Sequence, residues 1–144
     1  MTALPHTFEQ AVNHQIELLN SGEVLQALDI YFDDKGKMYE NDNLFGSNKI
    51  ECRTKQEPYI NSAKEIAGKI TNVKVLNHVQ VCIFRNKSRF IDQENKAIQI
   101  DGIHWQQWEN GKIIEERYYH GDKINDIIAL GLMDNPDNLK DICL

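Results

Sequence analysis

A β-hairpin predicted near the C-terminal end carries most of the side chains that could do chemistry. Asn110-Gly111 favours a type I′ turn of two residues, which places Glu109 opposite Lys112. Side chains alternate between the two faces of a sheet, so this register predicts one face with Asp101, Ile103, Trp105, Gln107, Ile114, Glu116, Tyr118 and His120. The other face would carry Gly102, His104, Gln106, Trp108, Ile113, Glu115, Arg117 and Tyr119. Both faces mix aromatic and ionisable groups, so we expect one face to line a pocket and the other to meet a partner.

Glu116 and Tyr118 lie two residues apart on one predicted face, so their side chains point in the same direction. A carboxylate and a phenol placed in this way could protonate or orient a substrate oxygen. Alternatively, Glu116 forms a structural ion pair with Arg53 or Lys64 from a preceding helix. The sequence leaves both interpretations open.

The predicted register also places Asp101 opposite His120. A carboxylate in this position could fix the tautomer of the imidazole and make it an acid or base near neutral pH. A surface ion pair at the edge of the sheet is the simpler interpretation, and we favour it because such pairs are common and contribute little to stability.

The remaining histidines do not have the spacing of a metal site. The sequence contains no H-x-H or H-E-x-x-H motif, no phosphate-binding glycine loop and no G-x-S-x-G motif. We therefore interpret His14, His78 and His104 as surface residues or hydrogen-bonded core residues. We expect neither a metal ion nor an organic cofactor.

Composition limits the class of protein. The 144 residues are enough for one domain with its own core. A net charge of -6 argues against nucleic acids and anionic membranes, which attract basic proteins. No apolar run approaches the ~20 residues that span a bilayer, and the N-terminus lacks the pattern of a signal peptide. Cys52, Cys82 and Cys143 show no C-x-x-C spacing, which predicts reduced thiols and a cytoplasmic location.

Apolar residues at helical spacing dominate the first half of the chain. Thr7 and Gln10 form a capping box ahead of a helix that extends to about Leu19. Ser21 could cap a short second helix. A long helix is predicted over residues 49–67.

Two segments of the first half contain residues that interrupt regular structure. Pro58 should kink or break the long helix, because an interior proline removes a hydrogen bond and clashes with the preceding turn. Residues 33–36 are typical of a turn and precede a predicted strand over residues 37–41.

The second half has the alternating pattern of strands. Strands are predicted over residues 73–75, 78–84, 97–108 and 112–120, whereas the polar residues 86–96 suggest a loop or a ragged strand end. Helices followed by a run of antiparallel strands indicate an α+β domain, with the helices on one face of a curved sheet.

These segments resemble one known superfamily. IDGIHWQQWENGKIIEERYYHGDKIND (residues 100–126) resembles the closing hairpin of the cone-shaped α+β barrel shared by nuclear transport factor two (NTF2), ketosteroid isomerase and the SnoaL-like polyketide cyclases. IELLNSGEVLQALDIYFDD resembles the opening helices of this cystatin-like fold, and KMYEND its first strand. The resemblance covers about residues 8–121. It is more specific for the fold than for a function, because the fold carries many activities.

The resemblance implies a pocket between the helices and the concave face of the sheet. Glu40 is the closest match to the general base at the end of the first strand, where Tyr39 and Trp105 would form walls. Gln15 and Ile103 lie at the positions of the two residues that donate hydrogen bonds to the oxyanion in ketosteroid isomerase. Glutamine is a weaker donor than the tyrosine of the isomerase, and the side chain of isoleucine donates no hydrogen bond. We therefore expect a ligand site at these positions without the isomerase activity.

The resemblance further implies a SnoaL-like pocket protein that acts on, or binds, a small and partly polar organic molecule. An enzyme of this kind would use cofactor-free acid–base chemistry: isomerisation, aldol-type cyclisation, dehydration or hydrolysis. Glu40 would be the base, and Glu116, Tyr118 and His120 would orient the substrate. A non-catalytic ligand-binding or protein-interaction dimer of the same fold is the alternative.

The cone-shaped domain is expected over residues 1–121. Residues 122–144 would form a tail that packs on the domain or on a dimer partner. We expect a homodimer through the outer face of the sheet, with Trp108 and Tyr119 as contacts.

Overall fold

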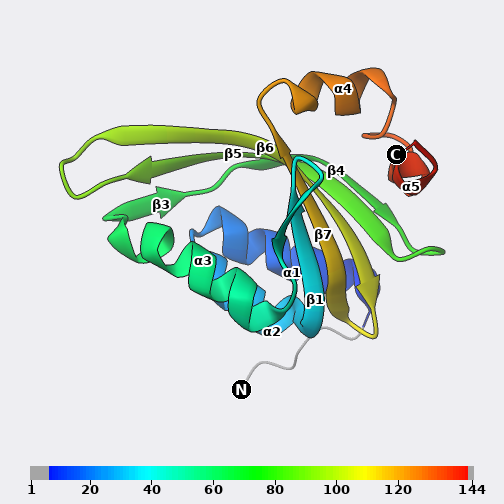
Figure 1. Ribbon diagram of the computed structural model, residues 1–144, viewed down its shortest axis with the longest axis horizontal. Helices are drawn as coiled ribbons and strands as arrows, with labels where there is room; N and C mark the ends of the chain where they lie inside the picture. The colour runs from blue at the N-terminus through cyan, green and yellow to red at the C-terminus, as the bar shows by residue number, and fades with distance from the viewer. Residues whose placement is uncertain (1–6, 143–144) are drawn as a thin grey trace.

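In a computed structural model, which describes residues 7–142, the chain forms an α+β fold built on one curved sheet (Figure 1). The strand order is β2-β1-β7-β6-β5-β3, β4 also pairs with β5, and the sheet does not close into a barrel. β1 and β7 run parallel, and the other pairs are antiparallel. The strands are β1 (Phe32–Glu40), β2 (Asn43–Gly46), β3 (Glu65–Ala67), β4 (Ile70–Leu76), β5 (Val81–Ile91), β6 (Ala97–Glu109) and β7 (Lys112–His120).

Three helices lie on the concave side of the sheet: α1 (Phe8–Asn20), α2 (Val24–Tyr31) and α3 (Lys49–Ser62). The predicted capping box of α1 is confirmed. Thr7 Oγ1 accepts a hydrogen bond from the Gln10 backbone N–H at 3.1 Å, and Gln10 Oε1 accepts one from the Thr7 N–H at 3.3 Å. The cap fixes where α1 begins, and its buried side then carries Ala11, Val12, Gln15 and Leu18.

The predicted helix over residues 49–67 is too long. Pro58 lies inside α3, which is not broken there and ends at Ser62. Ile66 and its neighbours form β3 and pair with the far end of β5, around Phe90. The prediction is wrong for residues 64–67 because pairing with a distant strand outweighs a local helical pattern.

Two strands are longer than the sequence predicted. β5 continues to Ile91 and pairs with β6 along its whole length, from Val81 opposite Gln107 to Ile91 opposite Ala97. Of the two alternatives predicted for residues 86–96, the strand end is therefore correct for residues 86–91 and the loop is wrong for them. The turn predicted over residues 33–36 lies within β1, where the pairing with β7 is interrupted between Phe32 and Lys37.

The predicted hairpin between β6 and β7 exists, but its register changes after the turn. Glu109 lies opposite Lys112, as predicted, and Trp108 lies opposite Ile113, whereas Gln107 lies opposite Glu115. Ile114 is therefore the extra residue of a β-bulge. A shift of one residue exchanges the faces of one strand relative to the other, so the predicted face assignment is wrong beyond the bulge.

The bulge brings a different set of residues together on the concave face. The concave face of the hairpin carries Gly102, His104, Gln106 and Trp108 with Ile113, Glu116 and Tyr118. Trp108 is 1% exposed and contacts Phe8 and Tyr31 inside the fold. Its predicted role as a dimer contact on the outer face is therefore wrong.

The C-terminal segment covers the convex face of the sheet (Figure 1). It comprises α4 (Lys123–Ala129), the 3₁₀ helix η1 (Pro136–Asn138) and α5 (Leu139–Ile142). Trp105 is buried beneath it and donates a hydrogen bond from Nε1 to the Pro136 carbonyl at 2.7 Å. The core under the segment consists of Val81, Ile83, Ile103, Trp105, Tyr119, Ile124, Ile127, Leu132 and Leu139. Cys143 lies outside the described residues.

Two leucines in this segment should respond differently to truncation, because only one of them is buried in the core. Leu132 is fully buried, so Leu132→Ala should lower the free energy of unfolding by about 2–5 kcal/mol. Leu130 is 52% exposed, so Leu130→Ala should change it by no more than about 0.5 kcal/mol. Urea unfolding monitored by circular dichroism gives both values, and equal effects would contradict the packing.

Candidate functional site

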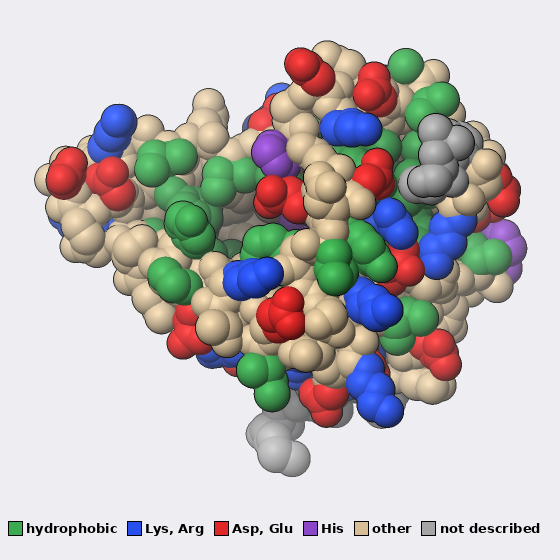
Figure 2. Space-filling model, viewed as in Figure 1, with side chains coloured by type: hydrophobic (Ala, Val, Ile, Leu, Met, Phe, Trp, Pro, Cys, Tyr) green, Lys and Arg blue, Asp and Glu red, His purple; other side chains and the backbone are tan. Residues whose placement is uncertain are grey.

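A cavity of about 470 Å³ lies between the helices and the concave face of the sheet. Figure 2 shows a hollow in this region, between the arm formed by the far ends of β5 and β6 and the body of the molecule. Apolar and tyrosine side chains form most of its wall, and seven other polar or charged side chains also line it. The lining residues are Leu19, Val24, Met38, Tyr39, Glu40, Phe45, Lys55, Gln56, Tyr59, Ile60, Asn86, Ser88, Phe90, Ile100, His104, Glu116 and Tyr118.

Glu116 lines this cavity and is held by a buried chain of amides. Its Oε1 accepts a hydrogen bond from Gln106 Nε2. Gln106 in turn exchanges two hydrogen bonds with Gln15, at 3.0 and 2.7 Å, and its Oε1 also accepts from Trp108 Nε1 at 3.1 Å. Gln15 and Gln106 are 3% and 0% exposed, and Glu116 is 8% exposed. Gln15 therefore supports the site from behind and does not line the cavity.

The only ion-pair partner of Glu116 within residues 7–142 is a histidine. His104 Nδ1 lies 3.6 Å from Glu116 Oε1. The predicted alternative, a bridge to α3, is wrong: Arg53 pairs with Asp29 and Glu57, and Lys64 donates to Asn95. Glu116 is thus a buried carboxyl group that accepts from an amide and lies beside an imidazole, with no lysine or arginine partner among the described residues.

Tyr118 lies between two imidazole rings on the same wall. Its ring centroid is 4.8 Å from that of His104 and 5.6 Å from that of His120. Gly102 makes this position possible, because a Cβ there would lie 2.2 Å from the Tyr118 ring. Burial, together with nearby carboxylates, raises the pKa of Tyr118 to about 12. At neutral pH this phenol is therefore a hydrogen-bond donor.

Glu40 and His120 lie at the outer end of the site. His120 Nε2 is 3.6 Å from Glu40 Oε1, and the two side chains are 44% and 50% exposed. Tyr39 also lines the cavity, and the Arg117 guanidinium lies 4.3 Å from the centre of its ring. Glu40 therefore occupies the rim, and the apolar enclosure that the sequence predicted for it surrounds Glu116 instead.

Three predicted pocket residues lie elsewhere. Ile103 and Trp105 are on the convex face under the C-terminal segment, because the bulge reverses the expected parity. Asp101 forms a two-point ion pair with Arg85, both bonds 3.0 Å long, and does not face His120. The Arg85 guanidinium holds the pKa of the Asp101 carboxyl below its usual range.

The sequence prediction missed His104, Gln106 and Asn86 as members of the site. One available signal was the adjacent apolar pair Ile113-Ile114, which breaks the alternation of β7. A pair of this kind indicates a bulge in a strand that otherwise alternates. Counting the register through it as one extra residue would have placed His104 and Gln106 beside Glu116.

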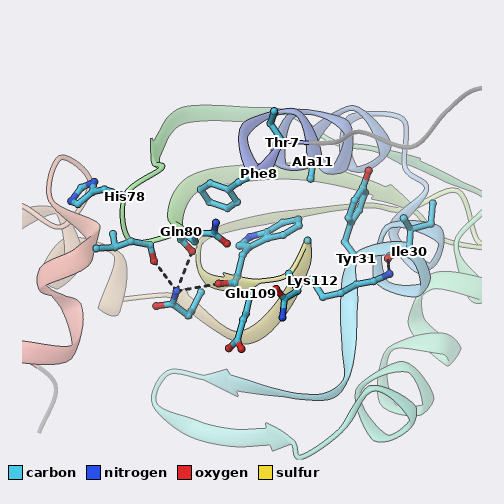
Figure 3. A pocket seen from close by; sticks show the side chains of 14 residues that line it. Thr7, Phe8, Ala11, Ile30, Tyr31, His78, Gln80, Glu109 and Lys112 are labelled. Atoms are coloured by element: carbon cyan, nitrogen blue, oxygen red, sulfur yellow. Dashed lines mark hydrogen bonds between the residues drawn. The ribbon is translucent and has the colours of Figure 1, made fainter.

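A second hollow, a groove of about 840 Å³, lies at the β6–β7 turn (Figure 3). Aromatic rings of Phe8, Tyr31 and Trp108 pack together along it. The Gln107 amide donates to the carbonyls of Val79 and Gln80 at 2.9 and 3.2 Å and thereby ties the two neighbouring turns together. The groove has no carboxylate–imidazole pair, so the cavity around Glu116 is the better candidate.

Several general features of the described residues bear on the class of site. No helix within residues 7–142 is long and apolar enough to cross a membrane. Over the same range no group of three or more His, Cys, Asp or Glu residues is arranged to hold a metal ion. Cys52 and Cys82 are buried free thiols, and burial raises the pKa of both above the usual range.

Comparison with solved structures finds the same architecture in many proteins. A protein from Mesorhizobium loti proposed to be a SnoaL-like polyketide cyclase is 20% identical, with a TM-score of 0.60 over 80% of this chain and 100% of that one. An NTF2-like protein of unknown function from Cytophaga hutchinsonii is 18% identical, with a TM-score of 0.57 over 78% and 97%. AclR, a candidate hydroxylase from Streptomyces galilaeus, is 10% identical, with a TM-score of 0.63 over 77% and 76%.

The chain has the SnoaL-like, NTF2-like fold. Its neighbours also include a cystatin-fold protein from Novosphingobium aromaticivorans, which agrees with the curved sheet and the N-terminal helices. No protein-family model matches the sequence, and no curated protein sequence matches it. At these identities the likeness establishes the fold and leaves the activity to be argued from the site.

The packing of Tyr118 on Gly102 can be tested by adding one methyl group. Gly102→Ala should displace the Tyr118 ring and cost about 1–3 kcal/mol of unfolding free energy. The pKa of Tyr118, read from its Cζ resonance by ¹³C NMR, should fall from about 12 toward the usual value of about 10. In a Tyr118→Ala background the same substitution should cost much less, and an equal cost would show that the clash lies elsewhere.

Proposed function

We propose that this protein binds a small, partly polar organic molecule in the cavity and acts on it by cofactor-free acid–base chemistry. The observation that carries the proposal is the Glu116 carboxylate, which lies in a largely apolar cavity without a lysine or arginine partner. A carboxylate that hydrogen bonds hold in place, and that no cation neutralises, is suited to accept a proton from a bound molecule.

Tyr118 supplies the complementary group. It lines the same cavity from the same strand as Glu116, and with a pKa of about 12 its phenol is protonated at neutral pH, as an ordinary tyrosine is. A phenol donates a hydrogen bond to an oxygen on which negative charge develops. With Glu116 as the base and Tyr118 as the donor, the site could support isomerisation, aldol-type cyclisation, dehydration or hydrolysis.

The groups at the rim have a different part in this proposal. Glu40 and His120 are each about half exposed, so they orient the polar end of a molecule that enters the cavity. Tyr39 forms part of the wall beside them. The role of general base, which the resemblance assigned to Glu40, belongs to Glu116 here because only Glu116 is enclosed by the cavity.

Proton abstraction can be tested without knowing the substrate. In D₂O, the protein should catalyse exchange of C–H protons next to the carbonyl in a panel of small cyclic ketones and β-hydroxy ketones, followed by ¹H NMR. Glu116→Gln should lower the rate by about 10²–10⁴-fold, the usual contribution of a general base. Glu40→Gln, the matched carboxylate at the rim, should lower it by less than about tenfold.

Two outcomes would contradict the acid–base proposal. One is exchange no faster than in buffer for every compound; the other is an equal loss in the two variants. Binding of the same compounds without exchange would favour the alternative, a non-catalytic ligand-binding protein of the same fold.

We also propose that the protein forms a homodimer in the cytoplasm through outer surfaces of the sheet that the C-terminal segment leaves uncovered. Trp105 and Tyr119 are buried beneath that segment and are not available as contacts. Sedimentation at micromolar concentration should show twice the chain mass, and a single species of 16.7 kDa would contradict the dimer.

A further inference from the structure

The His104 ring makes a contact that determines where its proton lies. Its Nε2 is 3.4 Å from Nδ2 of Asn86, on the neighbouring strand β5. An amide NH₂ group can only donate, so Nε2 must be the acceptor. In a neutral imidazole one nitrogen accepts and the other carries the proton, so the proton of His104 lies on Nδ1.

Ser88 and Glu116 together are consistent with this orientation of the Asn86 amide: with a proton on Nδ1 toward Glu116, Nε2 accepts from Asn86 Nδ2 and the Asn86 oxygen is left to accept from Ser88. Ser88 Oγ donates a hydrogen bond to Asn86 Oδ1, which leaves Nδ2 directed at His104. Ser88 is 7% exposed, and both residues lie on the concave side of β5 and line the cavity. Ser88, Asn86 and His104 therefore form one directed chain of donors and acceptors.

This chain ends at the carboxylate of the proposed base. His104 Nδ1 is buried, has no hydrogen-bond partner within the described residues, and lies 3.6 Å from Glu116 Oε1. The same oxygen already accepts from Gln106. Gln106 thus donates to Oε1, His104 Nδ1 is the next nitrogen beside that oxygen, and Oε2 accepts from no protein group among the described residues.

We propose that Ser88 and Asn86 are positioning residues that hold His104 as the neutral Nδ1–H tautomer. In this form His104 and Gln106 direct two neutral donors at one oxygen of Glu116 and leave the other oxygen to receive the proton of the substrate. This inference rests on the proposed function for its catalytic meaning, although the tautomer itself can be observed without any substrate.

The Asn86 contact opposes a proton on Nε2 of His104. An imidazolium carries protons on both nitrogens, and its Nε2–H would face the N–H of Asn86. The groups in contact with the ring are Glu116 and Tyr118 on β7 and Phe84 and Asn86 on β5, and of these only Glu116 and Tyr118 titrate. A proton on Nδ1 would face Glu116 Oε1, 3.6 Å away, whereas a proton on Nε2 would face the Asn86 amide.

The tautomer can be read directly by ¹⁵N NMR of histidine-labelled protein, with His104→Gln to assign the signals. At neutral pH, His104 should show a protonated Nδ1 and an unprotonated Nε2. A protonated Nε2, alone or together with Nδ1, would overturn the proposal even if no variant folds.

Variants connect the tautomer to the reaction. Asn86→Asp places an acceptor beside Nε2, so the proton should move there or both nitrogens should become protonated. The exchange rate should then fall by about tenfold, because an imidazolium next to Glu116 stabilises the carboxylate and weakens it as a base. Ser88→Ala should give mixed tautomers and a smaller loss, and Asn77→Asp, at an exposed turn, should change neither.

Failure of this inference differs from failure of the proposed function. An unchanged tautomer and rate in Asn86→Asp, with active wild-type protein, would refute the positioning role alone. The predicted tautomer in a wild-type protein without exchange activity would refute the acid–base function alone.

Discussion

The β-bulge at Ile114 determines which side chains meet inside the fold. In an uninterrupted register, Glu116 would face Trp105 across the hairpin, whereas the bulge places it opposite Gln106. Gln106 is completely buried, and a buried amide is costly unless its hydrogen bonds are satisfied. Gln15 from α1, Trp108 from β6 and Glu116 from β7 satisfy it. The packing of α1 on the sheet and the position of the candidate base therefore depend on one extra residue in one strand.

The same one-residue shift in register explains why the C-terminal segment packs on the convex face. With His104 and Gln106 turned inward, Ile103 and Trp105 project from the convex face, where Tyr119 joins them. Large apolar side chains of this kind favour burial by about 1.5–3 kcal/mol each. α4, η1 and α5 bury them, and Lys140 of α5 reaches back to Glu115 on β7 at 3.1 Å. The cavity around Glu116 and the covered convex face are thus two consequences of one register.

The parts of the fold that sequence could predict are the local ones. The capping box at Thr7 and the Asn110-Gly111 turn depend on neighbouring residues, and both are present with the predicted partners. The extension of β5 beyond Asn86 and the strand at Ile66 depend on pairing with distant segments, so local pattern missed them. The α+β class and the two-residue turn were therefore predictable. The faces beyond the bulge, and with them the position of His104, could be predicted only by interpreting the Ile113-Ile114 pair as a bulge, which uninterrupted alternation does not suggest.

The two carboxylates of the site differ in depth because of the parallel pairing of β1 with β7. That pairing sets Met38 beside Glu116 and Glu40 beside Tyr118, so Glu40 lies one step nearer the solvent. A buried carboxylate needs hydrogen bonds to offset the loss of water, and an arginine would supply them together with a neutralising charge. Here Gln106 donates to Glu116 instead, and His104 Nδ1 lies 3.6 Å from the same oxygen. In the proposed reaction this carboxyl group accepts the proton, a role that a neighbouring lysine or arginine would weaken by favouring the ionised form.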